Sequence, residues 1–232
     1  MLKVPSSHDP DTLLGMDLEY DSKNVTLSQR NLIEKGIELD GILNCHPVNT
    51  PLSVGTQFKE ATELEKAAFE KLKINYRTHT GILNYLACRT CPDIAPAVSI
   101  LSSFNNAPGI NHWRQFIHCW KHLAGTIDVK LTLWPDSKDT SKAIQHFTDA
   151  TWADEIETRL SRSGSIFFWK SFLVSWNRLI DKINNFGSNS KTKHFDIKAK
   201  WLHDLKKNNE ILVKLIPSEA VIAEALTKPR NQ

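Results

Sequence analysis

The chain has 232 residues, 41% of them hydrophobic and 24% charged, so it can bury the core of one large domain or two small ones. No apolar run reaches the roughly 18 residues of a membrane helix, and the first residues lack the apolar core of a secretion signal. Four scattered cysteines are too few for a disulfide scaffold, so we expect an intracellular protein, cytoplasmic or nuclear, without a membrane partner.

The first part of the chain predicts a β-hairpin and then a short helix. Apolar residues alternate with polar or small ones over residues 12–29, with turn-forming residues at 21–24. Ser28 has the position of an N-cap for a helix that ends near Gly41. Two prolines then predict an extended linker at residues 46–51, and the polar stretch up to Glu65 predicts little order.

Residues 76–125 predict three helices that pack well against one another. Pro92 ends the first helix, and Asp93 begins the second, which tolerates Pro96 in its first turn. A turn at residues 108–109 leads to the third helix, whose apolar residues recur at helical spacing up to Gly125. Three of these residues are large aromatics, so we expect the best-packed part of the chain here.

After residue 129 the pattern changes to short strands. Alternation predicts strands at 129–133 and 144–148, and a hairpin joins 166–169 to 172–176 across residues 170–171. Helices are predicted at 179–184 and 196–207, a strand at 211–216 and a last helix at 221–226. The predicted fold class is therefore α/β.

Basic residues gather near the C-terminus, although the net charge of the chain is only +3. The stretch 191–207 also contains aromatic side chains, and such a mixture can follow the phosphates of a nucleic acid. The candidate nucleic-acid-binding residues are Lys191, Lys193, His194, Lys198 and Lys200. A solvated helix face explains the same pattern, and composition alone favours that interpretation.

Two motifs suggest metal chemistry. Cys88 and Cys91 have the spacing of a zinc or redox site, but without a second such pair we interpret them as structural. Asp149 follows a predicted strand and precedes a hairpin, which is how a two-metal nuclease places its first carboxylate. That chemistry needs several clustered carboxylates, and a single Asp at a strand end is more often a turn residue.

A series of short motifs resembles the copia-type retrotransposon polyproteins, in the order found in that family. The motifs lie at residues 12–18, 27–29, 47–51, 76–81, 84–87, 92–95, 112–113, 122–126, 148–153, 161–164, 174–176, 193–197 and 223–229. Each is weak alone, but a dozen in register over nearly the whole chain is specific. The resemblance implies the palm end of a reverse transcriptase at 1–50, a helical thumb or connection region at 51–128, and an incomplete ribonuclease H-like domain with a truncated mixed sheet at 129–232.

The chain departs from that family at the sites that carry catalysis. The family's polymerase aspartates precede the first motif, so we expect no polymerase site here. Of the four acidic residues of the ribonuclease H site, Asp149 matches the first, and Glu224 replaces the Asp that is fourth. Asn177 continues directly into Arg178, where the family has the helix and strand that carry the second and third.

The resemblance therefore implies a degenerate fragment without catalytic activity. Asp149 and Glu224 remain as candidate catalytic residues and metal ligands, with Mg²⁺ as the cofactor only if activity persists. The implied partner is an RNA–DNA hybrid or another nucleic acid, and the oligomeric state is not predicted. We also expect four side chains of the hairpin to stay exposed or to pack onto the strand at 211–216, namely Phe167, Trp169, Leu173 and Trp176.

Two alternatives remain open. In the first, the chain is an active hybrid ribonuclease that recruits substitute carboxylates such as Asp154, Asp181 or Asp196. In the second, residues 76–125 form a helical module that binds other proteins. A genomic deletion and an error in exon assignment both explain the junction at Asn177, and sequencing the transcript across it distinguishes them.

Overall fold

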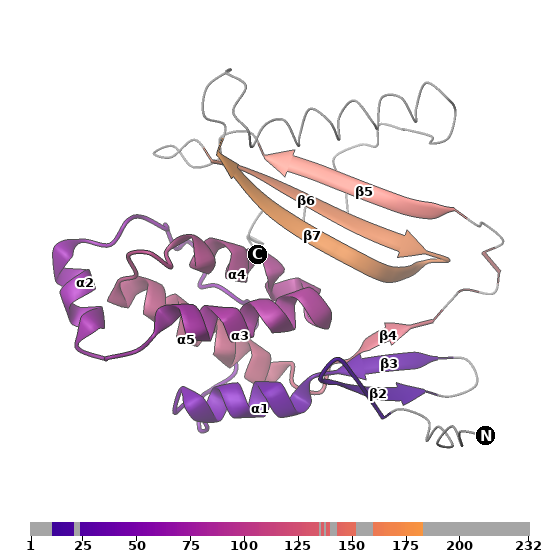
Figure 1. Ribbon diagram of the computed structural model, residues 1–232, viewed down its shortest axis with the longest axis horizontal. Helices are drawn as coiled ribbons and strands as arrows, with labels where there is room; N and C mark the ends of the chain where they lie inside the picture. Colours follow the sequence, from indigo (N-terminus) through magenta and orange to yellow (C-terminus); the bar gives the residue numbers. More distant parts are fainter. Residues whose placement is uncertain are drawn as a thin grey trace, which may run out of the picture.

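The computed structural model describes residues 11–20, 24–134, 136, 138–139, 143–151 and 160–182. They form two antiparallel sheets with helices between them (Figure 1). In chain order the elements are β1 (Thr12–Leu13), β2 (Met16–Tyr20), β3 (Val25–Ser28), α1 (Arg30–Leu39), α2 (Glu63–Glu70), α3 (Tyr76–Arg89), the 3₁₀ turn η1 (Pro92–Ile94), α4 (Ala95–Ser103), α5 (Ile110–Gly125), β4 (Leu131–Leu133), β5 (Ile144–Thr151), β6 (Leu160–Trp169) and β7 (Phe172–Lys182). The predicted α/β class is confirmed. None of the described helices is long and apolar enough to cross a membrane.

The first sheet has the order β1-β2-β3-β4 and contains the predicted hairpin as β2 and β3. Its fourth strand comes from much later in the chain, because Leu131 to Leu133 pair with Leu27 to Val25. The alternating residues after 129 thus complete the N-terminal sheet. The domain boundaries implied by the resemblance stay a prediction.

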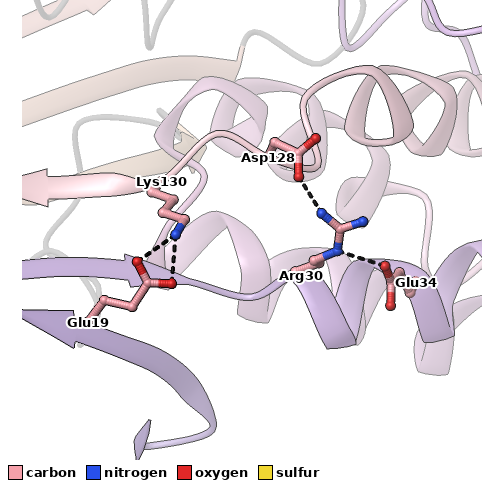
Figure 2. A network of polar contacts seen from close by, with 5 residues as sticks. All are labelled: Glu19, Arg30, Glu34, Asp128 and Lys130. Atoms are coloured by element: carbon pink, nitrogen blue, oxygen red, sulfur yellow. Dashed lines mark hydrogen bonds and ion pairs between the residues drawn. The ribbon is translucent and has the colours of Figure 1, made fainter. Parts of the chain in front are cut away.

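Two exposed ion-pair groups connect this sheet and α1 to the segment that precedes β4 (Figure 2). Arg30 contacts Glu34, at 2.8 Å, and also Asp128, while Lys130 Nζ lies 2.6 Å from a carboxylate oxygen of Glu19. Exposed pairs of this kind add little to the stability of a fold, because water and salt screen their attraction. These pairs therefore help to position the segment before β4 against the first sheet and α1, but they add little to its stability.

The start of α1 corrects one prediction. Ser28 is the last residue of β3, where it pairs with Asp17, and Gln29 is the N-cap instead. The Gln29 side chain makes no capping hydrogen bond, since its Oε1 accepts a hydrogen bond from the Thr90 hydroxyl at 2.8 Å. A tertiary contact thus replaces the local cap that the sequence predicts.

Helix α2 corrects a second prediction, because residues near Glu65 were expected to be poorly ordered. Thr62 caps this helix: its hydroxyl accepts from the Glu65 N–H at 3.3 Å, and its own N–H donates to the Glu65 carboxylate at 2.9 Å. This capping box is visible in the sequence as Thr-x-x-Glu. The prediction missed it.

The three helices predicted within 76–125 are confirmed as α3, α4 and α5, with η1 at the proline turn. Together with α1 and α2 they enclose the main core. Its most deeply buried side chains are Leu83, Leu86, Ile94, Leu101, Phe116, Cys119 and Trp120. The aromatic residues predicted on α5 are thus central to the core, and Trp113 stacks on Phe116 with ring centroids 4.8 Å apart.

The second sheet has the order β5-β6-β7, and the predicted hairpin is confirmed as β6 and β7. Lys170 and Ser171 take φ values of +46° and +67°, as in the type I′ turns that suit a two-residue hairpin. All strand pairs among the described residues are antiparallel, so the expected mixed pairing is not found there. The helix predicted at 196–207, the strand at 211–216 and the last helix lie outside the described residues.

A third correction concerns residues 179–182, which were expected to begin a helix. They continue β7 and pair with Leu160 to Ser163, so β6 and β7 are both longer than predicted. The junction at Asn177 and Arg178 therefore lies in the middle of an unbroken strand. Pairing with the first half of β6, which is distant in the sequence, overrides the local preference.

The second sheet packs against the helices with one face. Hydrophobic side chains from all three strands pack together with Ala95 of α4. These side chains are Phe147, Ile166, Phe168, Leu173 and Trp176. Trp176 Nε1 also donates to the Ala87 carbonyl of α3, at 2.6 Å. Phe168 and Trp176 of the hairpin are thus half-buried against α3 and α4, and the strand predicted at 211–216 lies outside the described residues.

Candidate functional site

Asp149 lies near the end of β5, as predicted, and its side chain is partly buried. It shares a face of the sheet with Phe147, because residues two apart in a strand point to the same side. Phe147 belongs to the cluster that contacts α4, so Asp149 lies on the face that is turned toward the helices. This face is the less accessible one for a long, stiff duplex.

The positions beside Asp149 hold no carboxylate. Asp149 pairs with Gly164 of β6, and Gly164 pairs in turn with Arg178 of β7. Among the residues that the structure describes, no group of three or more His, Cys, Asp or Glu side chains is placed to hold a metal ion. Glu224, the second predicted ligand, lies outside those residues.

The three substitute carboxylates are tested only in part. Asp154 and Asp196 lie outside the described residues, whereas Asp181 is in β7 opposite Ser161. Two inter-strand spacings of about 4.8 Å and three residue rises of about 3.4 Å separate the Cα atoms of Asp181 and Asp149 by roughly 14 Å. Two aspartates that far apart cannot share one metal ion.

The two cysteines of the C-x-x-C motif lie where the sequence places them, Cys88 in α3 and Cys91 directly before Pro92. Cys88 is exposed near the end of α3, and burial raises the pKa of Cys91 to about 11, so its thiol stays protonated. Two histidines of α5 have partners other than these cysteines: His118 Nδ1 lies 3.2 Å from Ser53 Oγ, and His122 Nε2 lies 2.9 Å from an Asp93 carboxylate oxygen. The basic candidates at 191–200 are all outside the described residues.

A buried acid–histidine pair was missed by sequence reasoning. Asp40 follows α1 and is 1% exposed, and its Oδ1 lies 2.8 Å from Nδ1 of His79, which is 13% exposed. Burial raises the pKa of Asp40 to about 6, although His79 acts in the opposite direction. The His79 ring meets Trp113 and Phe116 edge-on, so the pair belongs to the core. No motif marks it, since its members lie far apart in the sequence.

A small pocket of about 190 Å³ opens at the start of α5. Its lining includes Phe58, Asn111, Arg114 and Gln115, and no carboxylate or thiol. His112 also lines it, but Nδ1 of this ring accepts from the Gly109 N–H at 3.1 Å and Nε2 lies 2.9 Å from the Lys59 carbonyl. The pocket therefore lacks the groups that hydrolytic chemistry requires.

Comparison with known proteins identifies relatives over most of the chain. The retrovirus-related Pol polyprotein from transposon TNT 1-94 of Nicotiana tabacum is 25% identical over 277 residues, which cover 95% of this chain and 20% of the polyprotein. The chain is related to the copia-type retrotransposon Pol polyproteins. No family model and no solved structure matches it.

Two further relatives match shorter stretches of this Pol-related chain. An uncharacterized mitochondrial protein of Arabidopsis thaliana is 28% identical over 164 residues, or 71% of this chain and 65% of that protein. The secreted RxLR effector protein 161 of Plasmopara viticola is 33% identical over 103 residues, or 44% of this chain and 70% of the effector. The chain thus spans about a fifth of the tobacco polyprotein and just under two thirds of the Arabidopsis protein.

Proposed function

We propose that this chain is a catalytically inactive copia-type Pol remnant that retains affinity for nucleic acid. It would comprise the end of a reverse transcriptase and an incomplete ribonuclease H-like domain. The observation that carries the proposal is the surroundings of Asp149, whose neighbours across the sheet are Gly164 and Arg178. A nuclease that uses two metal ions needs several carboxylates at such positions.

The length of the match to the tobacco polyprotein supports a deletion. That match extends over 277 positions and covers 95% of the 232 residues of this chain, which is about 220, so about 57 aligned positions have no residue here. A missing helix and strand would account for a gap of this size. The unbroken course of β7 through Asn177 and Arg178 fits a chain that has closed over such a gap.

Magnesium is the metal that the family resemblance implies, and the described residues do not fit it. A hard cation held by one carboxylate keeps most of its water and gains little from the protein. Asp149 is a single carboxylate on the inward face, and no second one lies in its row of the sheet. We therefore assign no catalytic step to a bound metal.

A cleavage assay tests the loss of catalysis. The full chain is incubated with a labelled RNA–DNA hybrid and Mg²⁺ or Mn²⁺, beside the Asp149→Asn variant and an active hybrid ribonuclease as positive control. We expect both forms of the chain to leave the RNA intact while the positive control cleaves it. Metal-dependent cleavage that Asp149→Asn abolishes would favour the active-ribonuclease alternative and overturn the proposal.

A binding assay tests the second half of the proposal. Affinity of the full chain for the same labelled hybrid and for single strands is measured by fluorescence anisotropy at several salt concentrations. Contacts to phosphates weaken as salt rises, so we expect the dissociation constant to increase with salt. Absence of binding to every nucleic acid at low salt would contradict retained affinity.

A further inference from the structure

The second sheet carries a set of aromatic side chains on the face that points away from the helices. Alternation along the strands places Ile144, His146, Phe167, Trp169 and Phe172 on the side opposite to Asp149, and we call this set the aromatic face. His146 stacks flat on Phe167 with ring centroids 4.0 Å apart, and Trp169 meets Phe172 edge-on at 5.6 Å. The rings thus form two neighbouring pairs on one surface.

This face is accessible to solvent. Ile144 is 63% exposed and Trp169 is 37% exposed, and the His146 side chain is exposed as well. Phe167 and Phe172 are half-buried, and each contacts one of the more exposed rings. A group of solvent-exposed aromatic rings of this size on a sheet is typical of a binding surface.

The charge of the aromatic face is positive. Lys170 Nζ lies over the Trp169 ring, 5.2 Å from its centroid, and none of the five residues of the aromatic face is acidic. Asp181, on the same side of the sheet, lies at the far end of β7, opposite Ser161. Asp136 lies beside the hairpin turn, because its backbone N–H donates to the Lys170 carbonyl at 3.0 Å, and its carboxylate Oδ1 accepts from the Lys138 N–H at 2.9 Å. That carboxylate is thus engaged by its own turn, and the cation remains next to the rings.

We propose that the aromatic face binds the unpaired bases of single-stranded RNA or DNA, an inference that rests on the nucleic-acid affinity proposed above. Bases stack on Trp169 and on the open side of His146, and Lys170 contacts a backbone phosphate. Aromatic rings beside a cation are the usual combination in proteins that bind single strands without sequence preference. In a duplex the faces of the bases are already stacked, so a duplex cannot use these rings.

The spacing of the rings indicates one nucleotide for each pair. Phe167 and Trp169 are two residues apart in β6, which separates them by about 6.8 Å along the strand. The rise between stacked bases is only about 3.4 Å. Neighbouring bases must therefore separate to reach both rings, which an extended single strand allows.

The test uses the full chain with fluorescein-labelled oligo(dT) and oligo(rU) of 12 nucleotides, and a 12-base-pair RNA–DNA hybrid as comparison. Removal of one stacking ring typically costs about 1–3 kcal/mol per base, so we expect Trp169→Ala to weaken single-strand binding at least fivefold. His146→Ala, a change at an exposed position, should weaken it in the same direction. Tyr20→Ala is the matched control, since Tyr20 is a 47% exposed aromatic residue of the other sheet.

A charge variant gives a second, independent readout. Lys170→Gln should lower the slope of log affinity against log salt by about 0.7, the value for one phosphate contact to a single strand. Circular dichroism and thermal melting of each variant establish that it is folded. Trp169→Phe keeps a ring at this position and should retain most of the affinity.

Three outcomes would overturn the inference. Single-strand binding that Trp169→Ala and His146→Ala leave unchanged places the nucleic acid elsewhere, while the proposed function stands. A change of oligomeric state in these variants without a change in binding identifies the face as a contact between two copies of the chain. No binding to single strands or to the hybrid removes the proposed affinity together with this inference.

Discussion

Gly36 in α1 is the residue whose replacement should disturb the core most directly. A Cβ atom at this position would overlap the indole ring of Trp120, which is fully buried. Alanine normally favours a helix over glycine by about 1 kcal/mol, but overpacking a close-packed core costs about 1–3 kcal/mol. We expect Gly36→Ala to lower the free energy of unfolding in urea denaturation, despite the gain in helix propensity.

Gly81 in α3 provides the control for this prediction. Nothing lies within 4 Å of a Cβ added there, so Gly81→Ala keeps only the helix-propensity gain. It should raise stability by about 0.5–1 kcal/mol. Equal effects of the two substitutions would show that α1 does not contact Trp120 as described.

The Asp40–His79 pair predicts a pH effect on stability. Burial raises the pKa of Asp40 to about 6 from an ordinary value near 3.8, while His79 acts in the opposite direction. The folded chain binds the proton of the Asp40 carboxyl group more tightly than the unfolded chain does. The contribution of this group to the free energy of unfolding is therefore fully present below about pH 3.8 and is lost as the pH rises through about 6. Asp40→Asn should therefore lose less stability than the parent chain between pH 4 and pH 7.

Urea denaturation at a series of pH values measures this difference. At each pH, the free energy of unfolding of Asp40→Asn is subtracted from that of the parent chain, and this difference is compared between pH 4 and pH 7. Histidines other than His79 titrate in both proteins, so their effect cancels in the difference. A difference that stays constant over this range would mean that Asp40 is solvated in the folded chain. The pair itself would then not be buried.

Single-residue functions were only partly predictable from the sequence. Asp149 could be placed at a strand end because the alternation before it is local. Its neighbours Gly164 and Arg178 could not, because the register of β6 against β7 shifts at an irregularity between Phe167 and Phe168 that no sequence signal marks. The contact of Asp40 with His79 is likewise a product of how α1 and α3 pack.

At the scale of elements, local sequence signals predicted the helices, but they did not predict the strands whose formation depends on pairing with another strand. The three helices of residues 76–125 follow from proline positions and apolar spacing, and all three are present. Residues 179–182 were expected to be helical and are strand, since β6 offers them a ladder of partners. The partner of β4 in the first sheet was also beyond prediction, because more than a hundred residues separate Val25 from Leu133.

Trp176 connects β7 to the helices through its indole N–H, so removal of this N–H should loosen the contact between the second sheet and α3. The N–H donates to the Ala87 carbonyl at 2.6 Å, and Trp176→Phe removes this donor while it keeps an aromatic ring. Loss of one such hydrogen bond should lower stability by about 1 kcal/mol, and amides of β7 should exchange faster with solvent. Trp169→Phe, on the opposite face, should leave both quantities near the parent values. Equal exchange in the two variants would sink the idea that this hydrogen bond secures the sheet.

At the scale of the whole molecule, the apolar side chains are divided unevenly between the helices and the second sheet. The helical core contains most of the deeply buried residues, with Trp120 and Phe116 at its centre. In the second sheet, Ile166 is the one described hydrophobic side chain with less than a tenth of its surface exposed. Stability rises with buried apolar area, so the two parts should differ in how readily they open.

Hydrogen exchange measured by mass spectrometry tests this difference, and we expect slower exchange in residues 76–125 than in residues 144–182. Each large side chain that is fully buried contributes about 1.5–3 kcal/mol, and α3, α4 and α5 contain many of them. The second sheet opens more easily because the side chains of its aromatic face remain in contact with water, and because it is attached to the helices by one face only. The opposite order, with β5 to β7 better protected than α3 to α5, would show that the second sheet has a complete core. It would also weaken the proposal that residues 144–182 belong to a remnant, although the missing carboxylates beside Asp149 would still support that proposal.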